Sequence, residues 1–334
     1  MSCGNAGPRV GSTLEVRERA GRVAAGAGIF ALLGQAALIA GSETCVAFLI
    51  GGGVAALSGY SYAKLAARYP QSGGISEYFD EAFGAGRVAG TLTLIYLITL
   101  AVTVAMVAKA FGAYAAPLLL NTSDPIWVGV FGSVILVLLT LLNLAGRRMV
   151  GSTELLLVAI KLVILTGLML VGLVGTQAHP LNEQYHPSLF GILASVGLTF
   201  FAHAGYGMMA NAASSVAHPE RTIPRAIYLA IAVVAVLYVG LAVVVLQSIS
   251  PENLAAHADT AVAEAARPVL GHFGFVVVSI AALLATASAF NATLFSAIRI
   301  ATALADTGRL PGAFKLIPPI LRQSHARQRI TAMW

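Results

Sequence analysis

The stretch Arg22-Val-Ala-Ala-Gly-Ala-Gly-Ile-Phe-Ala-Leu-Leu-Gly34 places two glycines inside the first long apolar segment of the chain. Glycine in a helix interior costs about 1 kcal/mol relative to alanine, so Gly26 and Gly28 weaken a helix here. One interpretation is close packing of membrane helices through small residues. The other is an unwound stretch that exposes main-chain groups to a cavity, where the amino end of a half-helix would attract a carboxylate.

A second glycine-interrupted segment lies further along the chain. It reads Gly197-Leu-Thr-Phe-Phe-Ala-His-Ala-Gly-Tyr-Gly-Met-Met-Ala-Asn211 and carries a histidine, His203, in its middle. Two such segments, at corresponding positions of two five-helix halves, indicate a transporter binding site. Taken alone, His203 is more simply a core histidine bonded to a neighbouring carbonyl, and Phe200, Phe201 and Tyr206 are more simply packing residues.

Apolar segments continue through the whole chain of 334 residues, of which 58% are hydrophobic and only 10% are Asp, Glu, Lys or Arg. A typical soluble domain carries about 25% charged residues, so this composition predicts an all-α polytopic membrane protein. A helix needs about 20 residues to cross the bilayer. Eight segments reach that length, at about 22–42, 45–63, 88–116, 126–146, 152–175, 189–213, 226–250 and 271–305. They form one transmembrane domain, 22–314, between an N-terminal tail, 1–21, and a C-terminal tail, 315–334.

Lys and Arg residues gather on one side of this predicted array. They occupy the N-terminal tail, the loops after the second, fourth and sixth segments, and the end of the eighth, whereas the opposite loops contain only Arg267. The residues are Arg9, Arg17, Arg19, Arg22, Lys64, Arg68, Arg87, Arg147, Arg148, Arg221, Arg225, Arg299, Arg309 and Lys315. This asymmetry predicts a multi-pass protein of the cytoplasmic membrane with a cytoplasmic N-terminus. The net charge of +6 therefore reflects topology in the lipid bilayer, and no nucleic-acid partner is expected.

Lys161 lies within an apolar segment, so the gathering of Lys and Arg residues at the segment ends does not explain it. The fifth segment begins near Gly151, so at about 1.5 Å per residue Lys161 lies about 15 Å deep, in the middle of a hydrocarbon core of roughly 30 Å. A lysine at that depth costs about 2.5–3.5 kcal/mol or more and is a functional candidate. The alternative is a helix-packing lysine bonded to carbonyl groups.

The sequence offers no pattern typical of an enzyme or a metal site. It contains no GxSxG, HExxH or P-loop motif, and Gly51-Gly-Gly53 lies inside an apolar segment without a phosphate-binding context. Two cysteines, Cys3 and Cys45, form no zinc-binding spacing. We therefore expect no catalytic activity, no cofactor and no metal.

Four groups of residues, in order along the chain, resemble motifs of the amino acid–polyamine–organocation superfamily. Gly26-Ala-Gly-Ile-Phe30 resembles its first-helix motif, and Ala66-Ala-Arg-Tyr-Pro-Gln-Ser-Gly-Gly74 resembles the loop between helices two and three. Phe200-Phe-Ala-His-Ala-Gly-Tyr206, with Asn211 and His218-Pro-Glu-Arg-Thr-Ile-Pro-Arg225, is similar to the sixth helix and its following loop. Asn291-Ala-Thr-Leu-Phe295, with Arg299 and Asp306-Thr-Gly-Arg-Leu-Pro311, is similar to the eighth helix.

The resemblance implies a LeuT-type inverted-repeat fold with a core of five plus five helices, in which helices one and six are broken. It also implies secondary active transport of amino acids, with the substrate carboxylate on N–H groups of helix one and the ammonium on freed carbonyls of helices one and six. The substrate side chain would face helix six near His203 and Gly205. The substrate-binding residues implied in this way are Ala24, Ala25, Gly26, Ala27, Gly28, Ile29, Phe200, Phe201, Ala202, His203 and Gly205.

Ala159-Ile-Lys-Leu162 resembles the cationic-amino-acid-transporter-like branch, in which a fifth-helix lysine occupies the position of a sodium site. This implies coupling to protons through Lys161. Its ammonium would donate to carbonyls near Val23 to Gly26 and to hydroxyls of Thr286 or Ser288.

The chain departs from the family pattern in two ways. His203 stands where the family often has a tyrosine, and eight predicted segments are fewer than the ten helices of the fold core, so helices nine and ten are absent and the chain looks truncated after the eighth. The leading hypothesis is an amino acid permease, and the alternative is a truncated, non-transporting membrane fragment or partner subunit that transports poorly by itself. A channel or membrane enzyme is disfavoured, because no charged rings or catalytic clusters occur.

Overall fold

The computed structural model describes residues 27–69, 75–144, 151–175, 189–207 and 219–310, and all of the regular secondary structure in these stretches is helical. The α-helices are α2 (Gly28–Ala40), α3 (Thr44–Arg68), α4 (Ile75–Phe83), α5 (Arg87–Leu120), α6 (Pro125–Leu144), α7 (Gly151–Gly175), α8 (Leu189–His203), α10 (Pro219–Ser248), α11 (Pro251–Ala256), α12 (Ala261–Glu264) and α13 (Arg267–Asp306). Short 3₁₀ turns are η1 (Gly41–Glu43), η2 (Ala204–Tyr206) and η4 (Ala258–Thr260). The prediction of an all-α polytopic membrane protein is confirmed.

Seven stretches of the described residues are long and apolar enough to cross a membrane. They are Gly28–Arg68, Arg87–Leu120, Pro125–Leu142, Leu156–Gly175, Leu189–Tyr206, Glu220–Ser248 and Arg267–Ala305. The first contains two helices, α2 and α3, so it holds the predicted segment 45–63 and residues 28–42 of the predicted segment 22–42. The helices run together because η1 joins them directly, with Gly41 at a positive φ of 51° that glycine adopts without steric cost.

Two of these helices are too short to cross a bilayer alone. The 13 residues of α2 and the 15 residues of α8 each span roughly 20 Å, less than the roughly 30 Å of hydrocarbon. By contrast, α5, α10 and α13 have 34, 30 and 40 residues. Ala27, directly before α2, is 2% exposed and His203, the last residue of α8, is 3% exposed, so these two helix ends lie inside the molecule. The predicted interruption at Gly26 lies outside the described residues.

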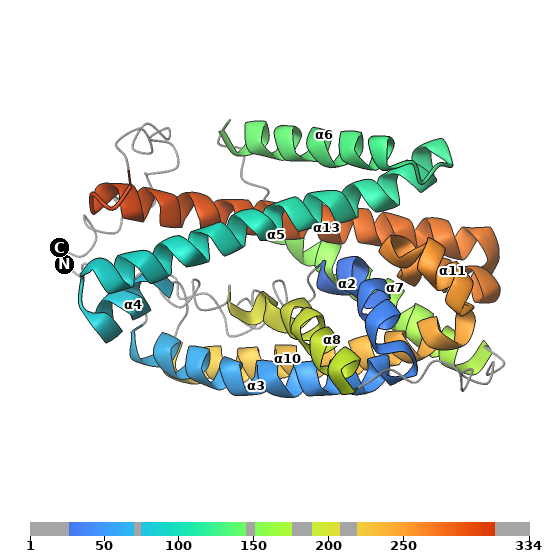
Figure 1. Ribbon diagram of the computed structural model, residues 1–334, viewed down its shortest axis with the longest axis horizontal. Helices are drawn as coiled ribbons and strands as arrows, with labels where there is room; N and C mark the ends of the chain where they lie inside the picture. The colour runs from blue at the N-terminus through green and yellow to red at the C-terminus, as the bar shows by residue number, and fades with distance from the viewer. Residues whose placement is uncertain (1–26, 70–74, 145–150, 176–188, 208–218, 311–334) are drawn as a thin grey trace, which may run out of the picture.

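The short helices lie between two layers of long ones (Figure 1). On one side α5 packs against α13 and α6, and on the other α3 packs against α10 and α8. The helix α2 contacts α8, η4 and α12, and α7 contacts α13 and α10. Large buried side chains such as Phe30, Phe48, Tyr114 and Tyr238 fill the centre. Many apolar side chains, including Val174 on α7, instead face outward, as helices surrounded by lipid require.

The end of the molecule that carries α11, η4 and α12 is closed over α2. A Cβ atom at Gly34 would collide with the backbone carbonyl of Ala258, so α2 and η4 are in backbone contact. The Asp259 carboxylate accepts a hydrogen bond from Gln35 at 2.8 Å and lies 3.4 Å from the Lys109 ammonium. Three separate elements, α2, η4 and α5, are thereby joined.

The opposite end is joined by a second ion pair. The Arg309 guanidinium, just after α13, donates to the Asp80 carboxylate on α4 at 3.0 Å. Apolar contacts beside it link Leu100 on α5 to Ile300 and Leu304 on α13. The start of α5, with Arg87, lies at this end as well, because Gly90 contacts the Arg309 side chain. Arg87 and Arg309 belong to the residues whose distribution predicts the cytoplasmic side.

Candidate functional site

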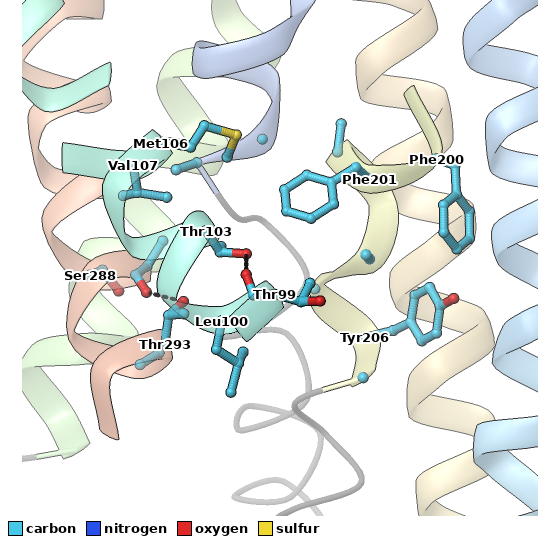
Figure 2. Close-up of a pocket in the computed structure, with 18 of the residues that line it drawn as sticks. Thr99, Leu100, Thr103, Met106, Val107, Phe200, Phe201, Tyr206, Ser288 and Thr293 are labelled. Carbon is cyan, nitrogen blue, oxygen red and sulfur yellow. Dashed lines mark hydrogen bonds between the residues drawn. The ribbon is translucent and has the colours of Figure 1, made fainter. Parts of the chain in front are cut away.

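A cavity of about 300 Å³ lies where the short and long helices meet (Figure 2). This volume is at the lower end of the range for small-molecule sites. The lining residues come from seven elements and are Ala27, Gly28, Ser58, Tyr62, Tyr96, Thr99, Leu100, Thr103, Met106, Val107, Lys161, Phe200, Phe201, Ala202, Ala204, Gly205, Tyr206, Gly207, Ser288, Ala289, Ala292 and Thr293.

The amino end of α2 forms one part of the cavity wall. Ala27 and Gly28 line the cavity, and the first helical hydrogen bond here runs from the Ala31 N–H to the Ala27 carbonyl at 3.0 Å. The N-cap residue, Ala27, makes no side-chain hydrogen bond to this end. The N–H groups of the first turn therefore have no acceptor within the helix, and the helix dipole makes the position electropositive.

The carboxyl end of α8 forms the adjoining part of the wall. Phe200, Phe201 and Ala202 line the cavity from the last turn of α8, and Ala204 and Gly205 line it from η2. Carbonyl groups at the end of a helix point along its axis and carry partial negative charge. Two helix ends of opposite sign thus meet at one cavity.

Gly28 brings these two helix ends into contact. A Cβ atom built on Gly28 would lie 2.7 Å from both the Cα and the carbonyl oxygen of Ala202, closer than real Cβ atoms approach other atoms. At this position the close-packing interpretation holds, and the same residue also lines the cavity. Ala24, Ala25 and Gly26, which were predicted beside it, lie outside the described residues.

His203 and Ile29 do not line the cavity. The His203 ring is 3% exposed, and its Nδ1 atom lies 2.7 Å from the Thr199 carbonyl oxygen. It packs against the rings of Phe48 and Tyr238, at centroid distances of 6.1 and 5.1 Å, and these two rings also contact each other. This environment favours the simpler interpretation of a core histidine. The Ile29 side chain is fully buried in the core, and its N–H belongs to the first turn of α2.

Lys161 is the one charged side chain among the described residues that line the cavity. It is 2% exposed and stands on α7, which packs against α13. Ser288 on α13 lines the same cavity, whereas Thr286 is buried outside it and donates to the Ala282 carbonyl at 2.7 Å. The carbonyls predicted as partners near Val23 to Gly26 lie outside the described residues.

The sequence interpretation missed the contribution of α5 to this site. Thr99, Leu100, Thr103, Met106 and Val107 all line the cavity from that helix. One signal was available, because Thr99 and Thr103 are four residues apart in an apolar segment and therefore share one helix face. Tyr62 and Ser58 on α3 were missed as well.

Comparison with known proteins identifies relatives over most of the chain. A protein family described as "Amino acid permease" matches residues 20–319. The chain is 47% identical over 287 residues to the inner membrane transport protein YbaT of Escherichia coli, covering 86% of this chain and 67% of that protein. It is 30% identical over 286 residues to the Asc-type amino acid transporter 1 of Mus musculus, covering 81% and 53%. Identity to the chloroplastic cationic amino acid transporter 9 of Arabidopsis thaliana is 26% over 314 residues, covering 88% and 54%. The chain thus spans from about half to two thirds of the length of these relatives.

Proposed function

Because the chain belongs to the amino acid permease family, we propose that it carries amino acids across the membrane and binds them in the cavity between α2 and α8. Two of the relatives, from Arabidopsis thaliana and Mus musculus, are named amino acid transporters, and the relative from Escherichia coli is named an inner membrane transport protein. We further propose that this protein resides in the cytoplasmic membrane with its N-terminus and its Arg309 end on the cytoplasmic side.

The observation that carries this proposal is the meeting of the two helix ends at Gly28 and Ala202. A free amino acid carries a carboxylate and an ammonium a short distance apart. The carboxylate would accept hydrogen bonds from the N–H groups of Ala27, Gly28 and Ile29 at the start of α2. The ammonium would donate to carbonyl groups at the end of α8, around Phe200 to Ala202. A zwitterion therefore complements both helix ends at once.

The proposal includes coupling to protons through Lys161. The Lys161 side chain is 2% exposed and lines the cavity, so the free energy of this buried group depends strongly on whether it carries a charge. With a proton bound, its ammonium can donate to groups on neighbouring helices, Ser288 among them. Without the proton it loses most of that attraction. Proton occupancy would thereby favour one of two helix arrangements over the other, which is what coupling requires.

The experiment is amino acid binding and uptake by the purified chain and one variant. We expect Gly28→Leu to abolish binding of labelled amino acids, because any side chain at this position displaces the start of α2 from Ala202. The matched control is Gly197→Leu in α8, where an added Cβ atom meets nothing within 4 Å, and it should bind as the wild type does.

Binding by Gly28→Leu at wild-type affinity would reject the site. Binding without uptake in proteoliposomes would retain the site and reject transport by this chain. If no amino acid binds to the wild type, the proposed function is wrong.

A further inference from the structure

The cavity has no acidic side chain among its described lining residues, and the sequence explains why. The chain has 14 Asp and Glu residues, and none lies in 44–76, 82–123, 155–182, 184–219 or 265–305. These ranges contain every described lining residue of α3, α5, α7, α8, η2 and α13. The stretch 19–42, which holds the start of α2, is also free of them.

Among the described lining residues, the one charged side chain is that of Lys161, which is positive when protonated. A lysine or arginine side chain bound here would be a second cation beside a described lining that has no carboxylate. Taking a charge out of water is costly unless an opposite charge compensates for it. The site is therefore unsuited to amino acids with cationic side chains, although one relative is named a cationic amino acid transporter.

Three threonines give the wall a defined hydrogen-bonding character. Thr99 donates its hydroxyl proton to the Ile95 carbonyl at 3.0 Å, and Thr103 donates to the Thr99 carbonyl at 2.7 Å. On α13, Thr293 donates to the Ala289 carbonyl at 2.8 Å. Because each hydroxyl proton is engaged by its own helix, the oxygen retains its lone pairs for other donors. On α5 and α13 these three threonine oxygens are thus available as hydrogen-bond acceptors, beside the hydroxyls of Tyr96 and Ser288.

Across from these threonines the wall combines an aromatic side chain, Phe201, with the hydroxyl residues Ser58, Tyr62 and Tyr206. Figure 2 shows the Phe201 ring on the side of α8 that faces α5, whereas the Phe200 ring lies on the other side of that helix. Phe201 offers contact to carbon atoms but no hydrogen-bond partner. A substrate side chain in this space meets an aromatic ring on one side and acceptor oxygens on the other.

We propose that the substrates are neutral amino acids whose side chains carry a hydrogen-bond donor, a hydroxyl or a carboxamide, and that Thr99, Thr103 and Thr293 accept from it. This inference rests on the proposed function and specifies its substrate class. A side-chain carboxylate presents only acceptors to the three threonine oxygens, and an aliphatic side chain leaves these oxygens without a donor. Hydroxyl and carboxamide groups satisfy them.

The test is a binding panel on the purified chain. Serine, threonine, asparagine and glutamine are compared with leucine and valine, with lysine and arginine, and with aspartate and glutamate. We expect the first four to bind most tightly and lysine and arginine to bind at least about tenfold more weakly, because one uncompensated charge outweighs a single hydrogen bond.

Near-isosteric variants then identify the residues responsible. Thr99→Val, Thr103→Val and Thr293→Val should each weaken binding of the hydroxyl and carboxamide substrates by about threefold to tenfold while leaving leucine unchanged. Thr91→Val on α5 and Thr302→Val on α13 are the controls. Both hydroxyls donate to a carbonyl four residues earlier, as the three threonines do, but neither residue is among those that line the cavity. These controls should bind all substrates as the wild type does.

The outcomes distinguish a failure of this inference from a failure of the proposed function. Lysine or arginine binding as tightly as serine would overturn it, and so would tightest binding of glutamate or aspartate, which would assign selectivity to Lys161. An unchanged preference in all three threonine variants would also overturn it. In each of these cases amino acids still bind and the proposed function stands, whereas a chain that binds no amino acid of the panel loses both.

Discussion

Lys161 is the residue at which burial and charge conflict most directly in this molecule. It is 2% exposed on a membrane-spanning helix, yet it belongs to the residue type that costs about 2.5–3.5 kcal/mol at the centre of a bilayer. Leucine or methionine could fill the same space without the cost of burying a charge, so packing alone does not explain a lysine here. Its position at the cavity therefore predicts an effect on transport.

We predict that Lys161→Ala folds but loses its response to a proton gradient. Wild-type uptake of labelled amino acid into proteoliposomes should rise several-fold when the outer solution is more acidic than the interior, because protons then enter down their gradient. The variant should give equal uptake with and without the gradient. Lys109→Ala is the control, since this lysine is exposed on α5 and its described ionic partner is Asp259, away from the cavity. Unchanged proton-driven accumulation in Lys161→Ala would exclude Lys161 as the coupling group and would support the alternative, a helix-packing lysine.

His203 gives a second prediction at this scale. Because its ring packs against Phe48 and Tyr238, His203→Ala leaves a cavity in the core and should destabilise the protein by about 2–4 kcal/mol. The measurement is the melting temperature in detergent, which should fall. His203→Phe, which refills the space, should recover most of that stability and bind substrate within about twofold of the wild type. A large loss of affinity in a stable His203→Phe protein would return His203 to the binding site.

At the scale of elements, glycine allows the helices to approach one another at several points. A Cβ atom at Gly112 on α5 would collide with the Val128 carbonyl, and one at Gly132 on α6 would lie 2.8 Å from the Ala108 carbonyl. The two helices are therefore in backbone contact through a pair of glycines. Such contacts are typical of membrane helices, which associate through packing of small residues.

We predict that Gly112→Ala destabilises the protein by about 1–3 kcal/mol, because the added methyl group forces α5 and α6 apart. The melting temperature in detergent should fall accordingly. Gly129→Ala on α6 is the matched control, since an added Cβ atom there meets nothing within 4 Å, and it should leave stability unchanged or slightly raised. Equal melting temperatures for both variants would show that the α5–α6 contact relaxes without cost.

The same elements show what the sequence predicts and what it does not. The glycines at 26, 28, 205 and 207 predicted interruptions in the first and sixth segments; α8 gives way to the 3₁₀ turn η2 at Ala204, whereas the position of Gly26 lies outside the described residues. The cavity-facing side of α5 was missed for a physical reason. A helix in lipid is apolar all round, so the periodicity that identifies the buried face of a soluble helix is absent. The resemblance placed His203 near the substrate side chain, and the sequence alone does not decide this, because a mid-membrane histidine has the same pattern whether it faces a ligand or a ring such as Tyr238.

At the scale of the whole molecule, an ion pair joins distant segments at each end. Arg309 and Asp80 connect the end of α13 to α4, and they are only partly exposed, at 20% and 33% of their side chains. Exposed ion pairs contribute about 0–1 kcal/mol, so this pair biases the arrangement of the two helices without locking it. Such a bias suits a part of the molecule that must move during transport.

We predict that Asp80→Asn makes the cavity more accessible from this end. The readout is the rate at which a membrane-impermeant thiol reagent labels a cysteine placed at Thr99, and we expect an increase of about threefold. Glu81→Gln, on an exposed neighbouring residue of α4, is the control and should leave the rate unchanged. Identical labelling in the Asp80 and Glu81 variants would mean that the ion pair does not restrain this end.

The helix α2 is in backbone contact with two separate elements, α8 and η4, so a movement at one contact is transmitted to the other. It contacts Ala202 through Gly28 and Ala258 through Gly34, and these two glycines are six residues, or about 9 Å, apart on the same helix. A tilt of α2 at η4 therefore also moves the N–H groups at its start. Seating of a substrate at one contact and seating of η4 at the other become thermodynamically reciprocal, each favouring the other by the same factor. An antibody fragment that separates η4 from α2 would therefore lower the affinity for substrate, and bound substrate would lower the affinity for the antibody fragment by the same factor.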